Sequence, residues 1–201
     1  MEQTHAHPTH SVTMPNTHGF AHPVTNISEI GVTSGMLIAE FGSGSGHYTL
    51  AMLAALKGHG HVFAIDVQKD MLRKVQNEAQ KKDLDKCLEI IWGDIEIKGG
   101  SKIAEKSLDM VLMSNVLFQL PDRKVAFVEA ARILKPYARL VIIDWSESFN
   151  NMGPRKEDVV TAESAQYEAE SVGFVLTRTF SAGAHHYGII MSLGIPQTKI
   201  T

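Results

Sequence analysis

Three glycines with one residue between each, Gly42-Ser-Gly-Ser-Gly46, follow an apolar run that contains a carboxylate, Glu40, near its end. Glycine adopts backbone angles that are closed to other residues and lets ligand atoms approach the main chain. A second apolar run ends at Asp66, twenty positions beyond Gly46 (66 − 46 = 20). A carboxylate there can accept both hydroxyls of an adenosine ribose, and its charge disfavours a ribose phosphate. These residues predict a site for a ligand with an unphosphorylated adenosine.

The spacing of the glycines separates the candidate ligands. A dinucleotide fingerprint reads G-x-G-x-x-G, and its third glycine would fall at the position of His47. A phosphate loop would need Gly-Lys-Ser/Thr, which does not follow. Glu40 beside the loop would repel a phosphate but suits a ligand with an ammonium and a sulfonium. We therefore predict S-adenosylmethionine as the cofactor, with S-adenosylhomocysteine as the product.

The elements that must position these residues alternate along the chain. Short apolar runs indicate strands, and apolar residues at helical spacing indicate the helices between them. A short leading helix, with Thr25 or Asn26 as its cap, is expected first. Strands are expected at 36–41, 61–67, 88–92, 108–113 and 139–143, and helices at 47–56, 69–82 and 123–134. This alternation with short links predicts a parallel sheet covered on both faces.

The end of the chain departs from this alternation. A helix at 161–172 precedes two strands at 174–180 and 187–193, with only six residues between the strands. Six residues are too few for a crossover helix, so the two strands should be antiparallel. The predicted fold is α/β: a Rossmann-like, doubly wound, seven-stranded sheet of five parallel strands plus a C-terminal antiparallel hairpin, with helices on both faces.

Composition sets the class of protein. The chain has 201 residues, of which 44% are hydrophobic and 20% charged, and its net charge is -3. We expect a flexible, His- and Pro-rich segment at 1–23, without a metal site, and one domain at 24–201. The single cysteine, Cys87, fits a reducing compartment. No apolar run approaches the roughly 18 residues of a membrane span, so we expect a cytoplasmic protein with no membrane partner.

The motifs in their order resemble the class I S-adenosylmethionine-dependent methyltransferases. The residues that carry this resemblance are Glu40 to Gly46, Asp66, Gly93-Asp94-Ile95, Leu108 to Asn115 and Arg132-Ile-Leu-Lys-Pro136. Within that superfamily the chain most resembles the small single-domain group related to the ubiquinone/menaquinone-biosynthesis methyltransferases. The resemblance spans roughly Thr25 to Leu193 and implies methyl transfer to an unidentified acceptor. An RNA or protein methyltransferase, or a catalytically silent cofactor-binding protein, stays open as an alternative.

The resemblance also implies roles for individual residues. Those implied to hold the methionine end, then the ribose and adenine, then the sulfonium are Glu40, Gly42, Ser43, Gly44 and Gly46; Asp66, Val67, Met71, Asp94 and Ile95; and Ser114 and Asn115. Met71 and Ile95 could equally be core residues, and Asp94 could cap a turn. Where the family usually has Gly-Gly after Lys-Pro, this chain has Tyr137-Ala138, so we expect that turn to avoid positive φ angles.

The methyl acceptor should be bound where the fourth, fifth and last strands meet. Their ends carry Asn115 and Gln119, Asp144 and Trp145, and His186 and Tyr187. We consider His186 as a general base, oriented by Asp144, with Asn115 as a further catalytic candidate. The alternatives are an exposed hairpin for His186 and a core position for Trp145. A small-molecule acceptor is favoured, nucleic acid is disfavoured but stays open, and the chain is expected to be a monomer or homodimer.

Overall fold

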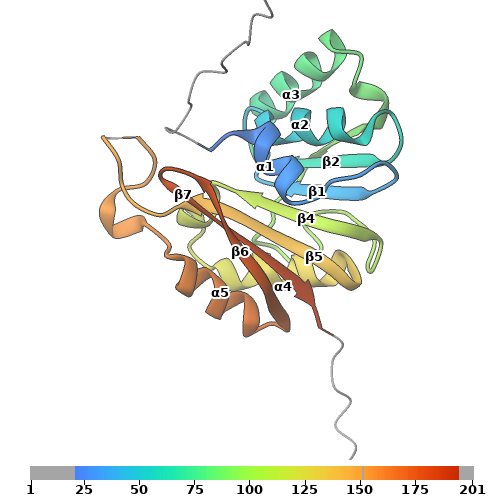
Figure 1. The fold of residues 1–201 in the computed structure, drawn as a ribbon. Coiled ribbons are helices and arrows are strands. Elements are labelled where there is room, and N and C mark those ends of the chain that lie inside the picture. Colours follow the sequence, from blue (N-terminus) through green and yellow to red (C-terminus); the bar gives the residue numbers. More distant parts are fainter. Residues whose placement is uncertain (1–20, 151, 195–201) are drawn as a thin grey trace, which may run out of the picture.

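The predicted strand runs come together in one sheet between two layers of helices in the computed structural model, which describes residues 21–150 and 152–194 (Figure 1). The strands are β1 (Leu37–Phe41), β2 (His61–Asp66), β3 (Leu88–Trp92), β4 (Leu108–Ser114), β5 (Leu134–Trp145), β6 (Phe174–Gly183) and β7 (His186–Leu193). The helices are α1 (Pro23–Glu29), α2 (His47–Leu56), α3 (Lys69–Lys81), α4 (Arg123–Ile133) and α5 (Ala162–Glu170), with 3₁₀ turns η1 (Asp85–Cys87), η2 (Leu117–Gln119) and η3 (Lys156–Asp158).

The strand order confirms the predicted fold. Across the sheet the order is β3-β2-β1-β4-β5-β7-β6. Neighbouring strands from β3 to β5 are parallel, and β7 is antiparallel to both β5 and β6. The order reverses at β1, which pairs with β2 on one side and β4 on the other. In open α/β sheets ligands bind outside the carboxyl ends of the strands at such a reversal.

Each face of the sheet has its own apolar core. On one face, side chains of α1, α2 and α3 such as Ile27, Met52 and Val75 pack on β1, β2 and β4. On the other face, α4 and α5 cover the sheet with side chains such as Phe127 and Ala165. Figure 1 shows the two helix layers on opposite sides of the strands. We call the face under α1 to α3 the donor face, because the glycine loop leads into α2 on that side.

The first helix begins earlier than its sequence predicts. His22, not Thr25 or Asn26, is its N-cap, and Pro23 occupies the first turn. Asn26 lies inside the helix with its side chain buried, and its amide donates to Tyr48 Oη at 2.8 Å and to the Ala182 carbonyl at 2.9 Å. The amide of Asn26 is therefore used to join α1 to α2 and to the end of β6.

The fifth strand and the terminal hairpin are longer than predicted. β5 begins directly after α4, at Leu134, and the turn between β6 and β7 has shrunk to two residues. Within β5, Tyr137 has a φ of 63°, so the expectation that this turn avoids positive φ is wrong. Tyr137 is 67% exposed and lies near the amino end of the strand. The unfavourable backbone angle is therefore remote from the carboxyl ends where the ligand is expected.

Most of the predicted flexible segment, residues 1–20, lies outside the described part of the chain; its last residues lead into α1. Among the described helices, none combines the length and apolar character needed to cross a membrane.

Candidate cofactor and active site

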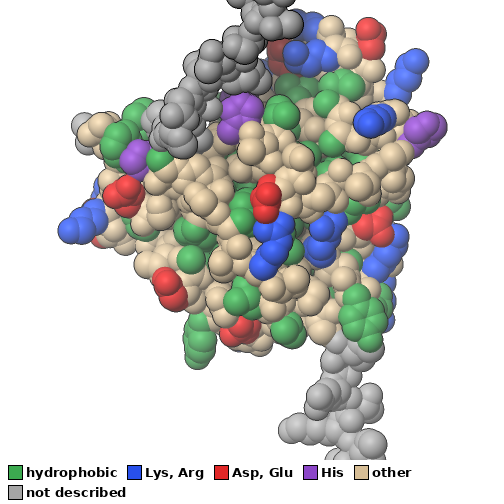
Figure 2. Space-filling model, in the orientation of Figure 1, with side chains coloured by type: hydrophobic (Ala, Val, Ile, Leu, Met, Phe, Trp, Pro, Cys, Tyr) green, Lys and Arg blue, Asp and Glu red, His purple; other side chains and the backbone are tan. Residues whose placement is uncertain are grey.

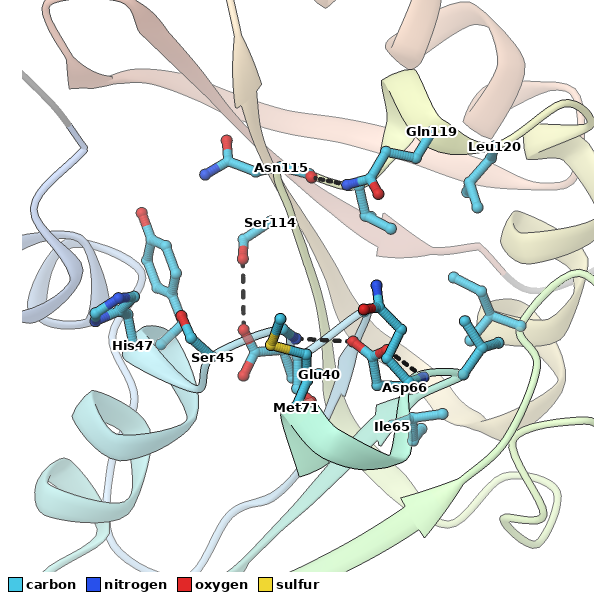
Figure 3. Close-up of a pocket in the computed structure, with 18 of the residues that line it drawn as sticks. Glu40, Ser45, His47, Ile65, Asp66, Met71, Ser114, Asn115, Gln119 and Leu120 are labelled. Carbon is cyan, nitrogen blue, oxygen red and sulfur yellow. Dashed lines mark hydrogen bonds between the residues drawn. The ribbon is translucent and has the colours of Figure 1, made fainter. Parts of the chain in front are cut away.

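A cavity of about 620 Å³ opens at the carboxyl ends of β1, β2 and β4, where the strand order reverses. Figure 3 shows its walls, with Glu40 and Asp66 at the base and Ser114 and Asn115 opposite. The sequence-predicted cofactor residues that line it are Glu40, Gly42, Ser43, Gly44, Asp66, Val67, Met71, Asp94, Ile95, Ser114 and Asn115. Residues that were predicted from the glycine loop and from several strand ends therefore line the same cavity.

Glu40 is a buried acid that no cation neutralises among the described residues. Its side chain is 1% exposed. The Thr49 hydroxyl donates to Oε2, and the Ser114 hydroxyl lies 3.4 Å from Oε1. Burial raises the pKa of Glu40 from 4.5 to about 8, although these two hydroxyls lower it and the Asp66 carboxylate adds repulsion. An acid in such a place is suited to a positively charged ligand.

The three glycines of the loop have different tasks. Gly42 has a φ of 74°, and a Cβ there would lie 2.7 Å from Val116 Cγ2. Gly44 has a φ of 49° and borders the cavity, where a Cβ would meet no atom within 4 Å. Gly46 is outside the cavity lining; it is the N-cap of α2, with a φ of 85°.

Gly46 instead permits close helix packing. A Cβ on Gly46 would lie 2.7 Å from Val75 Cγ2 on α3. The resemblance implies that Gly46 contacts the methionine end, but Gly46 does not line the cavity. It allows α2 to begin in close contact with α3.

Asp66 organises the loop from the neighbouring strand. Its Oδ2 accepts from the Gly44 amide, and its Oδ1 accepts from the Gln68 amide, both at 2.8 Å. Each carboxylate oxygen keeps a second lone pair for a ligand hydroxyl. Asp66 is only 8% exposed, so its backbone partners fix the carboxylate before any ligand arrives.

The residues expected beside the adenine lie together at the next strand ends. Val67 and Met71 come from the β2–α3 junction, and Asp94 and Ile95 follow β3. Asp94 Oδ1 accepts from the Glu96 amide at 2.9 Å, so the turn-capping alternative describes a bond that it makes. Ile95 lines the cavity and is also part of the core on the face opposite the donor face, so the core alternative describes its packing.

The loop after β4 closes the other side of the cavity. Asn115 has a φ of 52°, an uncommon angle for a residue other than glycine, and its Oδ1 is buried without a hydrogen-bond partner. Gln119 Nε2 donates to the Asn115 carbonyl at 2.9 Å, which fixes η2 to this loop (Figure 3). Strained backbone and unpaired polar atoms concentrate at functional sites.

Several lining residues were given no role in the site by the sequence analysis. They are Ala21, Pro23, Ser45, His47, Tyr48, Ile65, Gln68, Gly93, Glu96, Val116 and Leu120. Most adjoin a residue that was identified, so proximity in sequence to the loop and strand ends was the available signal. Ala21 and Pro23 belong to the segment that was expected to be flexible, and only the fold brings them to the cavity.

The expected pairing of Asp144 with His186 does not form. In the antiparallel pair of β5 and β7, Asp144 is opposite Tyr187, whereas Trp145 is opposite His186. Because side chains alternate along a strand, Asp144 and His186 lie on opposite faces of the sheet. Asp144 Oδ2 accepts from the Leu117 amide at 2.9 Å and Oδ1 from the Trp145 amide at 2.8 Å. Asp144 thus holds η2 against β5, and neither it nor His186 is part of the cavity lining.

In the described part of the chain no three His, Cys, Asp or Glu side chains gather as a group that could hold a metal ion.

Comparison with known proteins agrees with this geometry. A family model described as "Methyltransferase domain" matches residues 32–188. The ubiquinone/menaquinone biosynthesis C-methyltransferase UbiE of Ruegeria sp. is 24% identical over 179 residues, which cover 82% of this chain and 68% of the relative. Human arsenite methyltransferase is 34% identical over 119 residues, covering 53% of this chain and 30% of the relative. The chain therefore spans about two thirds of the first relative and under a third of the second.

Among solved structures, a SAM dependent methyltransferase from Aquifex aeolicus superposes with a TM-score of 0.77 at 25% identity. The match covers 85% of this chain and 89% of that one. The likeness thus extends over nearly the whole of both chains.

Proposed function

This chain belongs to the methyltransferase domain family, and from that premise we propose that it transfers a methyl group from S-adenosylmethionine to a small-molecule acceptor. S-adenosylmethionine is the cofactor that the family and the similar solved structure imply. The observation that carries the proposal is the Glu40 carboxyl, which is buried at the base of the cavity without a cationic partner among the described residues. A cofactor with an ammonium and a sulfonium supplies the missing positive charge.

The chain's own residues would bind and orient the reactants. When bound, S-adenosylmethionine supplies a methyl group that is already activated on a positively charged sulfur. Glu40 and the backbone at Gly42 to Gly44 would hold the methionine end, and Asp66 the ribose. Ser114 and Asn115, at the end of β4, would border the sulfur. Alignment of two reactants in a closed site is itself a large contribution to rate.

A small-molecule acceptor agrees with the charge of the protein. The net charge is -3. On the face shown in Figure 2, basic side chains are interspersed with acidic ones instead of forming one stripe. The single cysteine does not provide the set of thiols that would suggest arsenic as the acceptor atom.

The test is donor binding by Asp66→Ala, measured by isothermal titration calorimetry. We expect S-adenosylmethionine to bind at least tenfold more weakly, about 1.4 kcal/mol, because the ribose loses its acceptor and the Gly44 amide loses its partner. Asp70→Ala is the matched control, since that carboxylate pairs with Arg73 on the surface of α3. Unchanged affinity in Asp66→Ala would overturn the ribose assignment.

A metabolite extract incubated with isotopically labelled methyl donor then identifies the acceptor. Label that enters no small molecule, although the donor binds, would contradict a small-molecule methyltransferase.

A further inference from the structure

The donor face carries a row of side chains along the carboxyl edge of the sheet. Asp66, Glu40 and Ser114 each follow a donor-face core residue by two positions on β2, β1 and β4, so they point to that same face. Trp145 lies two positions after Ile143 on β5, and His186, which is opposite Trp145, lies four positions before Ile190 on β7, so both also point to the donor face. The row therefore runs from the cofactor cavity across two more strands and ends at His186.

The imidazole of His186 is unexplained by folding. The residue is 5% exposed, and neither ring nitrogen has a hydrogen-bond partner. Its described ring contact is with Trp145, at 4.2 Å between ring centroids. Leaving a buried polar atom unpaired lowers stability, whereas an apolar side chain of similar volume would avoid that cost. Unpaired groups of this kind call for a partner that the chain does not supply.

We propose that His186 is an acceptor-binding residue, whose ring nitrogens hydrogen-bond an uncharged, hydroxyl-bearing or amide-bearing methyl acceptor beside Trp145. The proposal rests on the proposed function. Ser114 and His186 stand two strands apart, about 10 Å along the sheet at the usual strand spacing. Trp145 lies between these two residues on β5, and neither it nor His186 lines the cofactor cavity. The acceptor would therefore extend from Ser114 past the edge of the cavity and over Trp145, with its polar group toward His186.

The charge of the imidazole selects the chemistry of its partner. Burial, and then the neighbouring His185, lower the pKa of His186 from 6.5 to about 4. At neutral pH one ring nitrogen therefore donates and the other accepts. Asp144, the nearest carboxylate along β5, points to the opposite face and does not charge the ring. A hydroxyl or an amide can pair with either nitrogen because it both donates and accepts, whereas an ammonium can pair only with the accepting nitrogen and a carboxylate only with the donating one.

The first test uses stability. His186→Leu should raise the urea midpoint of unfolding, because the variant removes two unpaired polar atoms at similar volume. His185→Leu is the matched control and should lower the midpoint or leave it unchanged, since His185 Nδ1 lies 2.7 Å from Glu147 Oε1 and its ring stacks on Phe149. A lower midpoint in His186→Leu would overturn the inference by giving the imidazole a structural role.

The second test uses the unmodified chain and three small aromatic probes that differ in charge. With S-adenosylhomocysteine present, phenol should shift the ring-nitrogen resonances of His186 in a ¹⁵N spectrum, whereas benzoate and benzylammonium should not. His186→Gln, which keeps a donor and an acceptor, assigns those resonances by their loss and should retain weaker phenol binding. Equal shifts with all three probes, or none with phenol, would overturn the inference.

Donor binding measured on the same samples separates the two proposals. A His186 that ignores phenol while the donor binds normally overturns this inference alone. Absence of donor binding overturns the proposed function.

Discussion

The charge state of one side chain, Glu40, decides how the cofactor cavity should respond to pH. Its raised pKa of about 8 follows first from burial. A raised carboxyl pKa means that the protein without its cofactor holds a proton there below pH 8. A cationic ligand favours the ionised carboxylate, so binding must release that proton.

We therefore expect S-adenosylmethionine to bind more weakly as the pH falls below about 8, by up to tenfold per pH unit. Calorimetry at several pH values, in two buffers with different ionisation enthalpies, measures both the affinity and the released proton. Glu40→Gln should bind weakly at every pH with a flat profile. Affinity that is constant from pH 6 to 8 in the unmodified chain would contradict the argument.

At the scale of elements, the glycine loop both borders the cavity and allows α2 to pack closely on α3, and these two roles can be tested separately. Gly44→Ala places a methyl group beside the cavity, and Gly46→Ala places one against Val75. Both impose a positive φ on alanine, so both lose about 1 kcal/mol of unfolding free energy. We expect Gly46→Ala to lose roughly 1–3 kcal/mol more, because its methyl group would clash with Val75 between α2 and α3. Urea denaturation measures this difference.

Of these two variants, Gly46→Ala should be the less stable, but Gly44→Ala should bind the donor more weakly. Gly44→Ala should weaken S-adenosylmethionine binding although its fold is the more stable of the two, because only Gly44 borders the cavity. If Gly44→Ala bound the donor normally, close approach of the ligand to that backbone would be wrong.

The residues that line the cavity could largely be predicted from sequence, whereas the directions of the Asp144 and His186 side chains could not. Glu40, Gly44 and Asp66 sit at the ends of short buried runs, so a local pattern places them at one edge of the sheet. The face to which Asp144 and His186 point depends instead on the register of β5 with β7. A shift of one residue exchanges the two faces. That register pairs two strands that are far apart along the chain, and the apolar pattern of each strand does not reveal it.

At the scale of the whole molecule, charge distinguishes the proposed acceptor from a nucleic acid. Binding to RNA depends on contacts of basic side chains with phosphates and weakens with salt. With a net charge of -3, we expect no saturable binding of a labelled single-stranded RNA in fluorescence anisotropy at low salt. Binding that disappears as salt is raised would instead favour an RNA acceptor and would locate a basic surface.

The hydrogen bonds of Asn26 connect the two ends of the fold through the wall of the cavity. Its amide reaches Tyr48, which borders the cofactor space, and the main chain of Ala182, at the tip of the terminal hairpin. The terminal hairpin thus supports the wall of the cofactor cavity, although β6 supplies no residue to the cavity lining. If the chain were cut between α5 and β6, the piece without β6 and β7 should no longer bind the methyl donor. Adding the missing piece back should restore the complete sheet and donor binding together.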